Sequence, residues 1–149
     1  MINNSICVPL EEKCSFCSYL RGERPYTILY RDHLAAILVT QEQRGNPHLL
    51  VIPCGHRETV LDLTDEEMMR ISILLKHLSI AIVKAYKSKG VSIWQNNGIS
   101  ASQSIPHVHF HIAGTLDEGG TDWGHVPELT LKETQKIANK VEKYFKFND

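Results

Sequence analysis

The chain has 149 residues, 42% of them apolar and 22% charged, and a formal net charge of -1. This length and composition are typical of one compact globular domain with a sizeable core. The near-zero charge argues against a basic nucleic-acid-binding surface or a polybasic membrane patch, and no apolar run is long enough to cross a bilayer. We therefore expect a single domain over residues 1–149, with no nucleic-acid partner and no membrane partner.

The cysteines indicate the compartment and a first candidate site. The N-terminus lacks the apolar core of a signal peptide, which predicts a cytoplasmic protein. In such a chain the spacing of Cys14 and Cys17 favours metal or redox chemistry over a structural disulfide. The redox interpretation expects a thioredoxin-like strand–helix context, which is absent here. Two thiolates at this spacing can bind one zinc ion together with two further ligands. Candidate histidines for those positions are His33, His48, His56, His107 and His125.

Short apolar runs separated by turn residues predict a sheet, whereas residues 1–25 read as irregular. Residues 26–31 and 34–39 predict a hairpin. Further strands are expected over residues 48–52, 91–95 and 107–112.

Two capping boxes predict the helices. Thr64 with Glu67 opens a long helix to about Ser88, ended by Gly90, and Thr130 with Glu133 opens a C-terminal helix to about Phe145. The sequence therefore predicts an α+β domain with a five-stranded, mainly antiparallel sheet, one long helix and one C-terminal helix.

The long helix carries more apolar residues than one sheet should need. Met69, Ile73 and Ile80 lie partly outside the main apolar stripe, which comprises Ile71, Leu74, Leu75, Leu78, Ile82 and Ala85. Either the helix is deeply buried or part of it faces a second subunit.

The stretch from His107 to Ile112 alternates three histidines with three apolar residues, which is the period of a strand. Val108, Phe110 and Ile112 should enter the core, while the three imidazoles project from the other face. Histidine suits proton transfer, nucleophilic attack and metal ligation near neutral pH. Two interpretations stay open on spacing alone: a catalytic metal on the histidines, or a histidine nucleophile positioned by its neighbours.

These residues resemble those of the histidine-triad (HIT) family of nucleotide hydrolases and transferases. His107-Val-His109-Phe-His111 is similar to the family's triad motif, and Cys14-x-x-Cys17 with Arg21-Gly22-Glu23-x-Pro25 resembles its N-terminal signature. The strand from His48 to Pro53 with His56, and Asn96-Asn97-Gly98 with Gln103-Ser104-x-Pro106, also resemble family motifs. The resemblance runs collinearly from about residue 14 to 113, and it implies a HIT-like fold and a homodimer whose sheets join.

The resemblance also implies roles for single residues. His109 would be the nucleophile that attacks the α-phosphorus of a nucleotide substrate, with His111 and His48 contacting the phosphate and holding the array. Substrate contacts would come from Asn96 beside the ribose and phosphate, and from Gln103 and Ser104 at the phosphate and leaving group. In the zinc-bearing branch a structural zinc ion is held at the positions of Cys14, Cys17, His56 and His107.

Three departures from the family pattern concern the substrate. Thr40 stands where the family usually has an acidic or amide residue that holds the ribose, Ser102 replaces a common glycine, and Ala113-Gly114-Thr115 replaces Ile-Pro-Arg.

The resemblance as a whole predicts a nucleotide hydrolase or transferase that acts on a nucleoside 5′-phosphoryl bond. Two alternatives are a zinc- and nucleotide-binding regulatory module with little turnover, and a metallohydrolase with its metal on the triad. Trp94 and Trp123 read as packing residues, and His125 has no assigned role.

Overall fold

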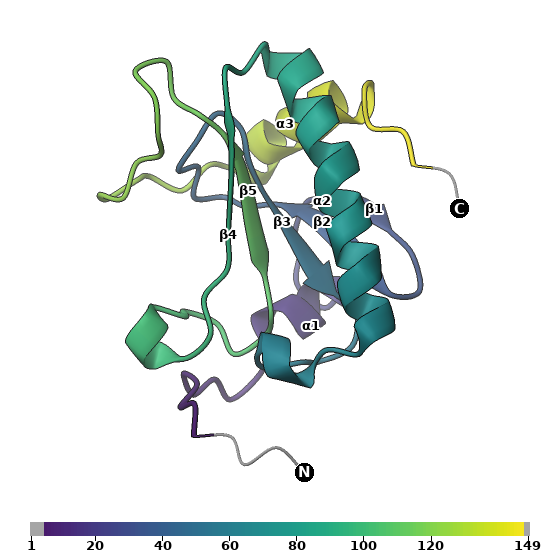
Figure 1. Ribbon diagram of the computed structural model, residues 1–149, viewed down its shortest axis with the longest axis vertical. Coiled ribbons are helices and arrows are strands. Elements are labelled where there is room, and N and C mark those ends of the chain that lie inside the picture. The colour runs from purple at the N-terminus through teal and green to yellow at the C-terminus, as the bar shows by residue number, and fades with distance from the viewer. Residues whose placement is uncertain (1–4, 148–149) are drawn as a thin grey trace.

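The computed structural model describes residues 5–147, and within them one five-stranded sheet has the order β1-β2-β3-β5-β4 with every neighbouring pair antiparallel (Figure 1). The predicted α+β class is therefore confirmed. The strands are β1 Ile28–Arg31, β2 Ala35–Val39, β3 His48–Pro53, β4 Val91–Trp94 and β5 Phe110–Gly114. The helices are α1 Ser15–Leu20, α2 Asp65–Tyr86 and α3 Leu131–Glu142.

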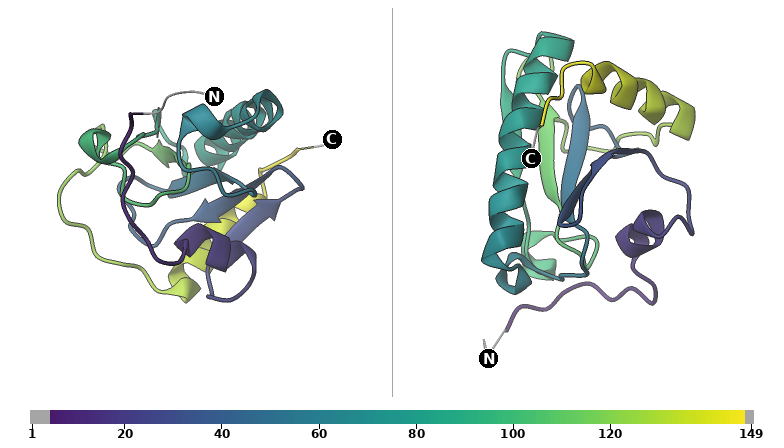
Figure 2. Two further views of the ribbon diagram at one scale, coloured as in Figure 1. Left: turned by 90° about the horizontal axis from the view of Figure 1, so that it is seen from below. Right: turned by 90° about the vertical axis from the view of Figure 1, so that its right-hand side faces the viewer.

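The two faces of the sheet are covered by different helices, as the right-hand view of Figure 2 shows. One face packs against α2 and α3 in a large core that includes Ile37, Val51 and Ile112. The opposite face packs against the short helix α1 through a smaller cluster that includes Phe16 and Leu38. Burial on both faces explains why β2 and β3 read as nearly continuous apolar runs. Within the described residues no helix is both long and apolar enough to span a bilayer.

The long helix departs from its predicted ends. Thr64 caps it as expected, because the Thr64 hydroxyl accepts the N–H of Glu67. The Glu67 carboxylate pairs with the Arg57 guanidinium at 2.8 Å instead of accepting the Thr64 N–H. The second hydrogen bond of the predicted capping box is therefore wrong. The helix ends at Tyr86, with Lys87 in the left-handed region at φ 54°, rather than at Ser88 before Gly90.

Helix α1 lies in a segment that the sequence predicts as irregular, and that prediction is wrong for residues 15–20. Its N-terminal N–H groups are satisfied by unusual caps. The Cys17 N–H donates to the Cys14 Sγ at 3.4 Å, and the Ser15 N–H donates to the Glu11 carboxylate. Neither Glu11 nor Cys14 is one of the Ser, Thr, Asp or Asn residues that cap most helices, so the sequence does not indicate that a helix starts here.

The C-terminal helix starts as predicted at the capping box of Thr130 and Glu133. It ends at Glu142, three residues before the predicted Phe145. The hairpin of β1 and β2 is confirmed.

Candidate functional site

The histidine stretch divides between two sites. The strand β5 begins only at Phe110, so His107 and His109 precede it. Val108, Phe110 and Ile112 join the α2 core as predicted. All three imidazoles lie on the α1 side, opposite these apolar residues, since Phe16 packs against the rings of His107 and His109 and lines the cleft with His111. The predicted strand is too long at its start, because it leaves His109 and, farther away, His107 in the segment before β5. A tight turn, with the His107 N–H donating to the Ile105 carbonyl, precedes the strand and directs this imidazole toward the two cysteines.

The first site is a cluster of Cys14, Cys17, His56 and His107, whose ligand atoms all lie within 4.8 Å of one another. The Cys14 Sγ is 3.3 Å from the His107 Nδ1, and the Cys17 Sγ is 3.5 Å from the His56 Nδ1 and 3.6 Å from the His107 Nδ1. Tetrahedral zinc with Zn–S of about 2.3 Å and Zn–N of about 2.0–2.1 Å requires S···N separations of about 3.6 Å. The donor set and its spacing therefore fit a zinc ion.

The surroundings of the cluster also suit a metal. The His107 Nε2 lies 3.0 Å from the Pro53 carbonyl. Donation to this carbonyl leaves the lone pair on Nδ1, the atom facing the thiols, as second-shell bonds to metal-ligating histidines usually do. Burial and the neighbouring Cys14 raise the pKa of the Cys17 thiol to about 11, so two adjacent thiolates need a cation to coexist.

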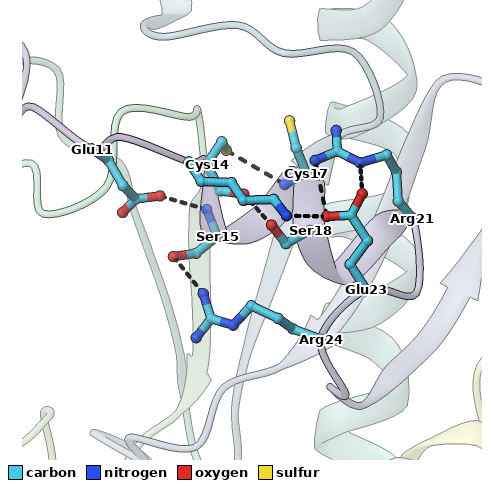
Figure 3. A network of polar contacts seen from close by, with 9 residues as sticks. Glu11, Cys14, Ser15, Cys17, Ser18, Arg21, Glu23 and Arg24 are labelled. Atoms are coloured by element: carbon cyan, nitrogen blue, oxygen red, sulfur yellow. Dashed lines mark hydrogen bonds and ion pairs between the residues drawn. The ribbon is translucent and has the colours of Figure 1, made fainter.

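Figure 3 shows how the segment around the cysteines is braced. The Ser18 hydroxyl donates to the Cys14 carbonyl at 3.0 Å, and Glu23 forms ion pairs with Arg21 and Lys13. The first contact holds the N-cap Cys14 to α1, and the Lys13–Glu23 pair joins the segment before the helix to the loop after it.

The second site is a cleft of about 760 Å³ on the α1 side of the sheet. His48, His109 and His111 line it together with aromatic residues from distant parts of the chain. These aromatics are Phe16, Tyr19, Tyr26, Trp94 and Trp123. A cleft with apolar walls and a few convergent polar groups is the usual form of a small-molecule site.

His109 is held in one tautomer within this cleft. Its Nδ1 lies 2.7 Å from the carbonyl oxygen of His107, which can only accept, so Nδ1 carries the proton. The Nε2 therefore bears the lone pair. Burial lowers the pKa of His109, which keeps the ring neutral near pH 7. The Phe16 ring packs against the His109 ring at a centroid distance of 5.2 Å.

His48 and His111 form a second pair beside His109. The His48 Nε2 lies 3.0 Å from the His111 Nδ1. Burial lowers the pKa of His48 to about 4 and that of His111 to about 2. Trp94 stacks on His111 with an interplanar angle of 3° and a centroid distance of 4.8 Å. The three histidines of the cleft are thus uncharged in the free protein.

The predicted substrate-binding residues do not all reach the cleft. Asn96, Ser104 and Thr40 line it, whereas Gln103 does not. The Gln103 side chain is buried, and its amide accepts from the Gly98 N–H and donates to the carbonyls of Glu58 and Ile105. This amide holds the shape of the loop from residue 98 to 105.

That loop contains two residues with positive φ. Gly98 has φ 93°, and Ser102, at the position where the family usually has glycine, has φ 67°. A left-handed backbone conformation at residue 102 explains why glycine is favoured there.

Of the remaining zinc-ligand candidates, His48 lies in the cleft, while His33 and His125 are exposed and lie outside both the metal cluster and the cleft lining.

Sequence reasoning missed several cleft residues. Trp123 is 68% exposed at the cleft, edge-on to Trp94, and so is not a packing residue as predicted. The Arg44 guanidinium donates to the carbonyls of Asp122 and Gly124 on either side of Trp123. These contacts join segments about 80 positions apart, which no local pattern reveals.

Comparisons with known proteins agree with this geometry. Residues 21–117 match the family model described as the HIT domain. "Protein hit" of Bacillus subtilis is 32% identical over 138 residues, which cover 89% of this chain and 94% of that protein. Adenosine 5′-monophosphoramidase hnt1 of Schizosaccharomyces pombe is 29% identical over 131 residues, covering 86% and 95%. A zinc-bound histidine triad family protein from Mycobacterium smegmatis shares the fold, with a TM-score of 0.75, 20% identity and coverage of 88% and 94%. Since the family model matches well over half of the sequence, the chain belongs to the HIT family.

Proposed function

We propose that this protein is a nucleotide hydrolase or transferase that cleaves a nucleoside 5′-phosphoryl bond through a covalent nucleotidyl-histidine on His109. The observation that carries the proposal is the hydrogen bond of 2.7 Å between the His109 Nδ1 and the His107 carbonyl. It leaves an unprotonated Nε2 on a neutral ring that lines the cleft. A neutral imidazole with its lone pair directed at a substrate is an activated nucleophile.

The proposed reaction has two displacements at phosphorus. The His109 Nε2 attacks the α-phosphorus and expels the leaving group, and water or another acceptor then releases the nucleotide and restores His109. His111, Asn96 and Ser104 line the cleft where they can contact the phosphate. Backbone N–H groups of the neighbouring loop can add anion binding without a free cationic side chain. The name of the S. pombe relative, a monophosphoramidase, supports an amine as one leaving group.

We propose a structural zinc ion at Cys14, Cys17, His56 and His107. Four protein ligands close a tetrahedral shell, so the ion would stabilise the fold and would not activate water. The zinc-bound M. smegmatis structure of the same fold supports this assignment. We also propose the cytoplasmic location expected from the sequence, because a Cys14–Cys17 pair that binds a metal needs a compartment that keeps thiols reduced.

We also propose a homodimer formed through α2 and the edge strand β4. Apolar residues on this side of the molecule remain exposed by 43–60%: Met69, Ile73, Ile80, Val83 and Ile93. The outer edge of β4 pairs with no strand among the described residues, so it can extend the sheet into a second copy. Light scattering should give a dimer for the wild type and for Leu61→Glu, an exposed apolar site elsewhere, but a monomer for Ile73→Glu.

The metallohydrolase alternative requires a metal on the triad, but His107 lies in the cysteine cluster while His109 and His111 lie in the cleft. A regulatory module with little turnover would bind nucleotides without forming an adduct.

A panel of nucleoside phosphoramidates and dinucleoside polyphosphates, followed by phosphorus NMR, tests the proposal. His109→Ala should lower turnover at least about a thousandfold, whereas His33→Ala, at an exposed turn, should not. Binding without turnover in the wild type, or a near-normal rate for His109→Ala, would contradict it.

A further inference from the structure

The two cysteines of the metal cluster lie on one turn of helix, in a segment that the sequence predicts as irregular. Cys14 is the N-cap of α1 and Cys17 is its third residue, so the two side chains are three positions apart and lie on the same side. The ligand atoms of the cluster, both sulfurs among them, lie within 4.8 Å of one another. The thiols can therefore bond to each other through a local movement of the first turn.

An outer pocket opens onto the cluster from solvent. It has a volume of about 500 Å³, and Cys14, Cys17 and His56 are among the residues that line it. Within residues 5–147, none of its lining residues also lines the histidine cleft. A small solute can therefore reach the thiols without entering the cleft where the nucleotide would bind.

The two sulfurs have different surroundings. Cys14 packs against the apolar cluster of Phe16 and Leu38 beneath α1, and its Sγ accepts the Cys17 N–H. The Cys17 Sγ instead lies 3.5 Å from the Nδ1 of the exposed His56. Cys17 is therefore the thiol that a small solute meets first, with Cys14 behind it.

One residue joins the cluster to the nucleophile. The His107 Nδ1 lies 3.3 Å from the Cys14 Sγ, and the backbone carbonyl of His107 accepts the His109 Nδ1–H at 2.7 Å. Phe16, which lies between the two cysteines in the chain, packs against the rings of both histidines. A change of ligands at the cluster therefore acts on the groups that fix the tautomer and the orientation of His109.

We propose that Cys14 and Cys17 form an oxidation site, at which a hydroperoxide converts the two zinc-binding thiolates into a disulfide, releases the zinc ion and slows adduct formation on His109. This inference rests on the proposed zinc site and the proposed function, and it extends both by giving the cluster a regulatory role. No thioredoxin-like fold is needed, because the cysteines are here the target of the oxidant and not a catalyst of disulfide exchange. A thiol reductant together with zinc reverses the change.

The oxidation has two steps, written here for hydrogen peroxide. In the first, the Cys17 thiolate attacks one peroxide oxygen. An S–O bond forms, the O–O bond breaks, and its electron pair leaves on hydroxide, so Cys17 becomes a sulfenic acid. In the second, the Cys14 thiolate attacks the Cys17 sulfur. The S–S bond forms, the S–O bond breaks, and a second hydroxide leaves. The two cysteines lose two electrons, the peroxide gains them, and solvent protons convert both hydroxides to water.

The disulfide removes both anionic ligands from the metal. Only the neutral imidazoles of His56 and His107 remain, and two ligands do not make the four-coordinate shell of a structural zinc site. The ion therefore leaves. The His107 ring then keeps one polar anchor, the Pro53 carbonyl at its Nε2, so the backbone carbonyl that holds His109 is less firmly placed.

Treatment of the zinc-loaded wild type with hydrogen peroxide tests the oxidation site. A colorimetric chelator measures released zinc, mass spectrometry of alkylated peptides identifies the disulfide, and quenched flow follows adduct formation with the 4-nitrophenyl ester of AMP. We expect zinc release in step with a Cys14–Cys17 disulfide. The adduct rate should fall at least about tenfold, because a misplacement of about 1 Å can cost about a hundredfold. Dithiothreitol with added zinc should restore the rate.

The other two cysteines supply matched controls. Cys7 is exposed, and Cys54 packs against the same apolar cluster as Cys14. Cys7→Ser and Cys54→Ser should release zinc and lose activity at the same peroxide dose as the wild type. Resistance of either variant, or a disulfide from Cys14 to Cys54, would contradict the assignment of the Cys14–Cys17 pair.

Hydrogen exchange separates a local change from unfolding. In the oxidised protein, exchange should rise over residues 12–21 and 105–109 but not along α2. A rise across α2 as well would show that the rate falls through global unfolding, and it would overturn the link to His109.

The remaining outcomes distinguish the separate claims. Zinc retained at a dose that oxidises the exposed Cys7 would overturn the oxidation site. Zinc release with an adduct rate within about twofold of the untreated rate would overturn the link to His109. Before any peroxide is added, absence of zinc would contradict the proposed metal site, and absence of an adduct on His109 would contradict the proposed function.

Discussion

Phe16 connects the cysteine cluster to the nucleophile, and its removal should affect both. The ring is 2% exposed and lies 5.6 Å from the His107 ring and 5.2 Å from the His109 ring, centroid to centroid. Truncation of a buried phenylalanine to alanine costs about 3–5 kcal/mol. For a domain of about 150 residues, each kcal/mol lowers Tm by about 2–4 °C. Phe16→Ala should therefore lower the Tm of the zinc-loaded protein by roughly 6–20 °C.

The loss should extend to the rate of adduct formation. A misplacement of a reacting group by about 1 Å can cost about a hundredfold in rate, and Phe16→Ala removes the aromatic wall that orients His109. Phe145→Leu is the matched control, because Phe145 contacts Tyr30 away from the cleft. It should lower Tm but not the rate. Calorimetry and quenched-flow measurement of the adduct test both effects. A Phe16→Ala rate within about twofold of the wild type would show that Phe16 does not orient His109.

Three further predictions concern the metal, pH and the sugar. Cys17→Ser should lose bound zinc and show a lower Tm, because metal-binding energy is folding energy; metal analysis that finds unchanged zinc would contradict this. Burial places the folded pKa values of His48 and His111, about 4 and about 2, below the unfolded value of about 6.5. The unfolded chain then binds more protons, so the free energy of unfolding should fall as pH drops from 7 toward 4. Urea titrations should show a flatter pH dependence for His48→Gln, and equal slopes would count against the assignment. One Thr40 hydroxyl contact is worth about 0.5–1.5 kcal/mol, so ribose and 2′-deoxyribose substrates should differ less than about tenfold in kcat/KM, and Thr40→Asp should bind the ribose form more tightly. A wild-type preference above about a hundredfold would exclude Thr40 as the main sugar contact.

The parts of the fold that follow local rules could be predicted from the sequence. The hairpin, the long helix from Thr64 and the C-terminal helix from Thr130 all carry a hydrophobic period together with a cap or turn. The errors occur where a side chain takes a partner other than the one that the usual capping pattern predicts. Glu67 leaves its capping box because Arg57, ten residues earlier, offers a charged partner. Helix α1 forms because a thiol and a glutamate cap it.

The candidate site also contains residues that the sequence identifies and residues that only the folded structure brings together. The motif residues were found by resemblance, and spacing alone could not separate the metal role of His107 from the cleft roles of His109 and His111. The turn before β5 makes that separation, and it depends on packing rather than on the alternating pattern. Trp123 lies at the cleft in a loop that Arg44 holds from about 80 positions away, a contact that no local pattern reveals.

The most direct test of the central claim is the identification of the adduct. The wild-type protein is mixed with adenosine 5′-monophosphoramidate, quenched within the first turnover under conditions that preserve the phosphorus–nitrogen bond, digested and analysed by mass spectrometry. Covalent catalysis by His109 predicts one adenylyl group per chain, on His109. An adduct on His107 or His111, or AMP release from a quenched enzyme that carries no adduct at any time, would contradict it.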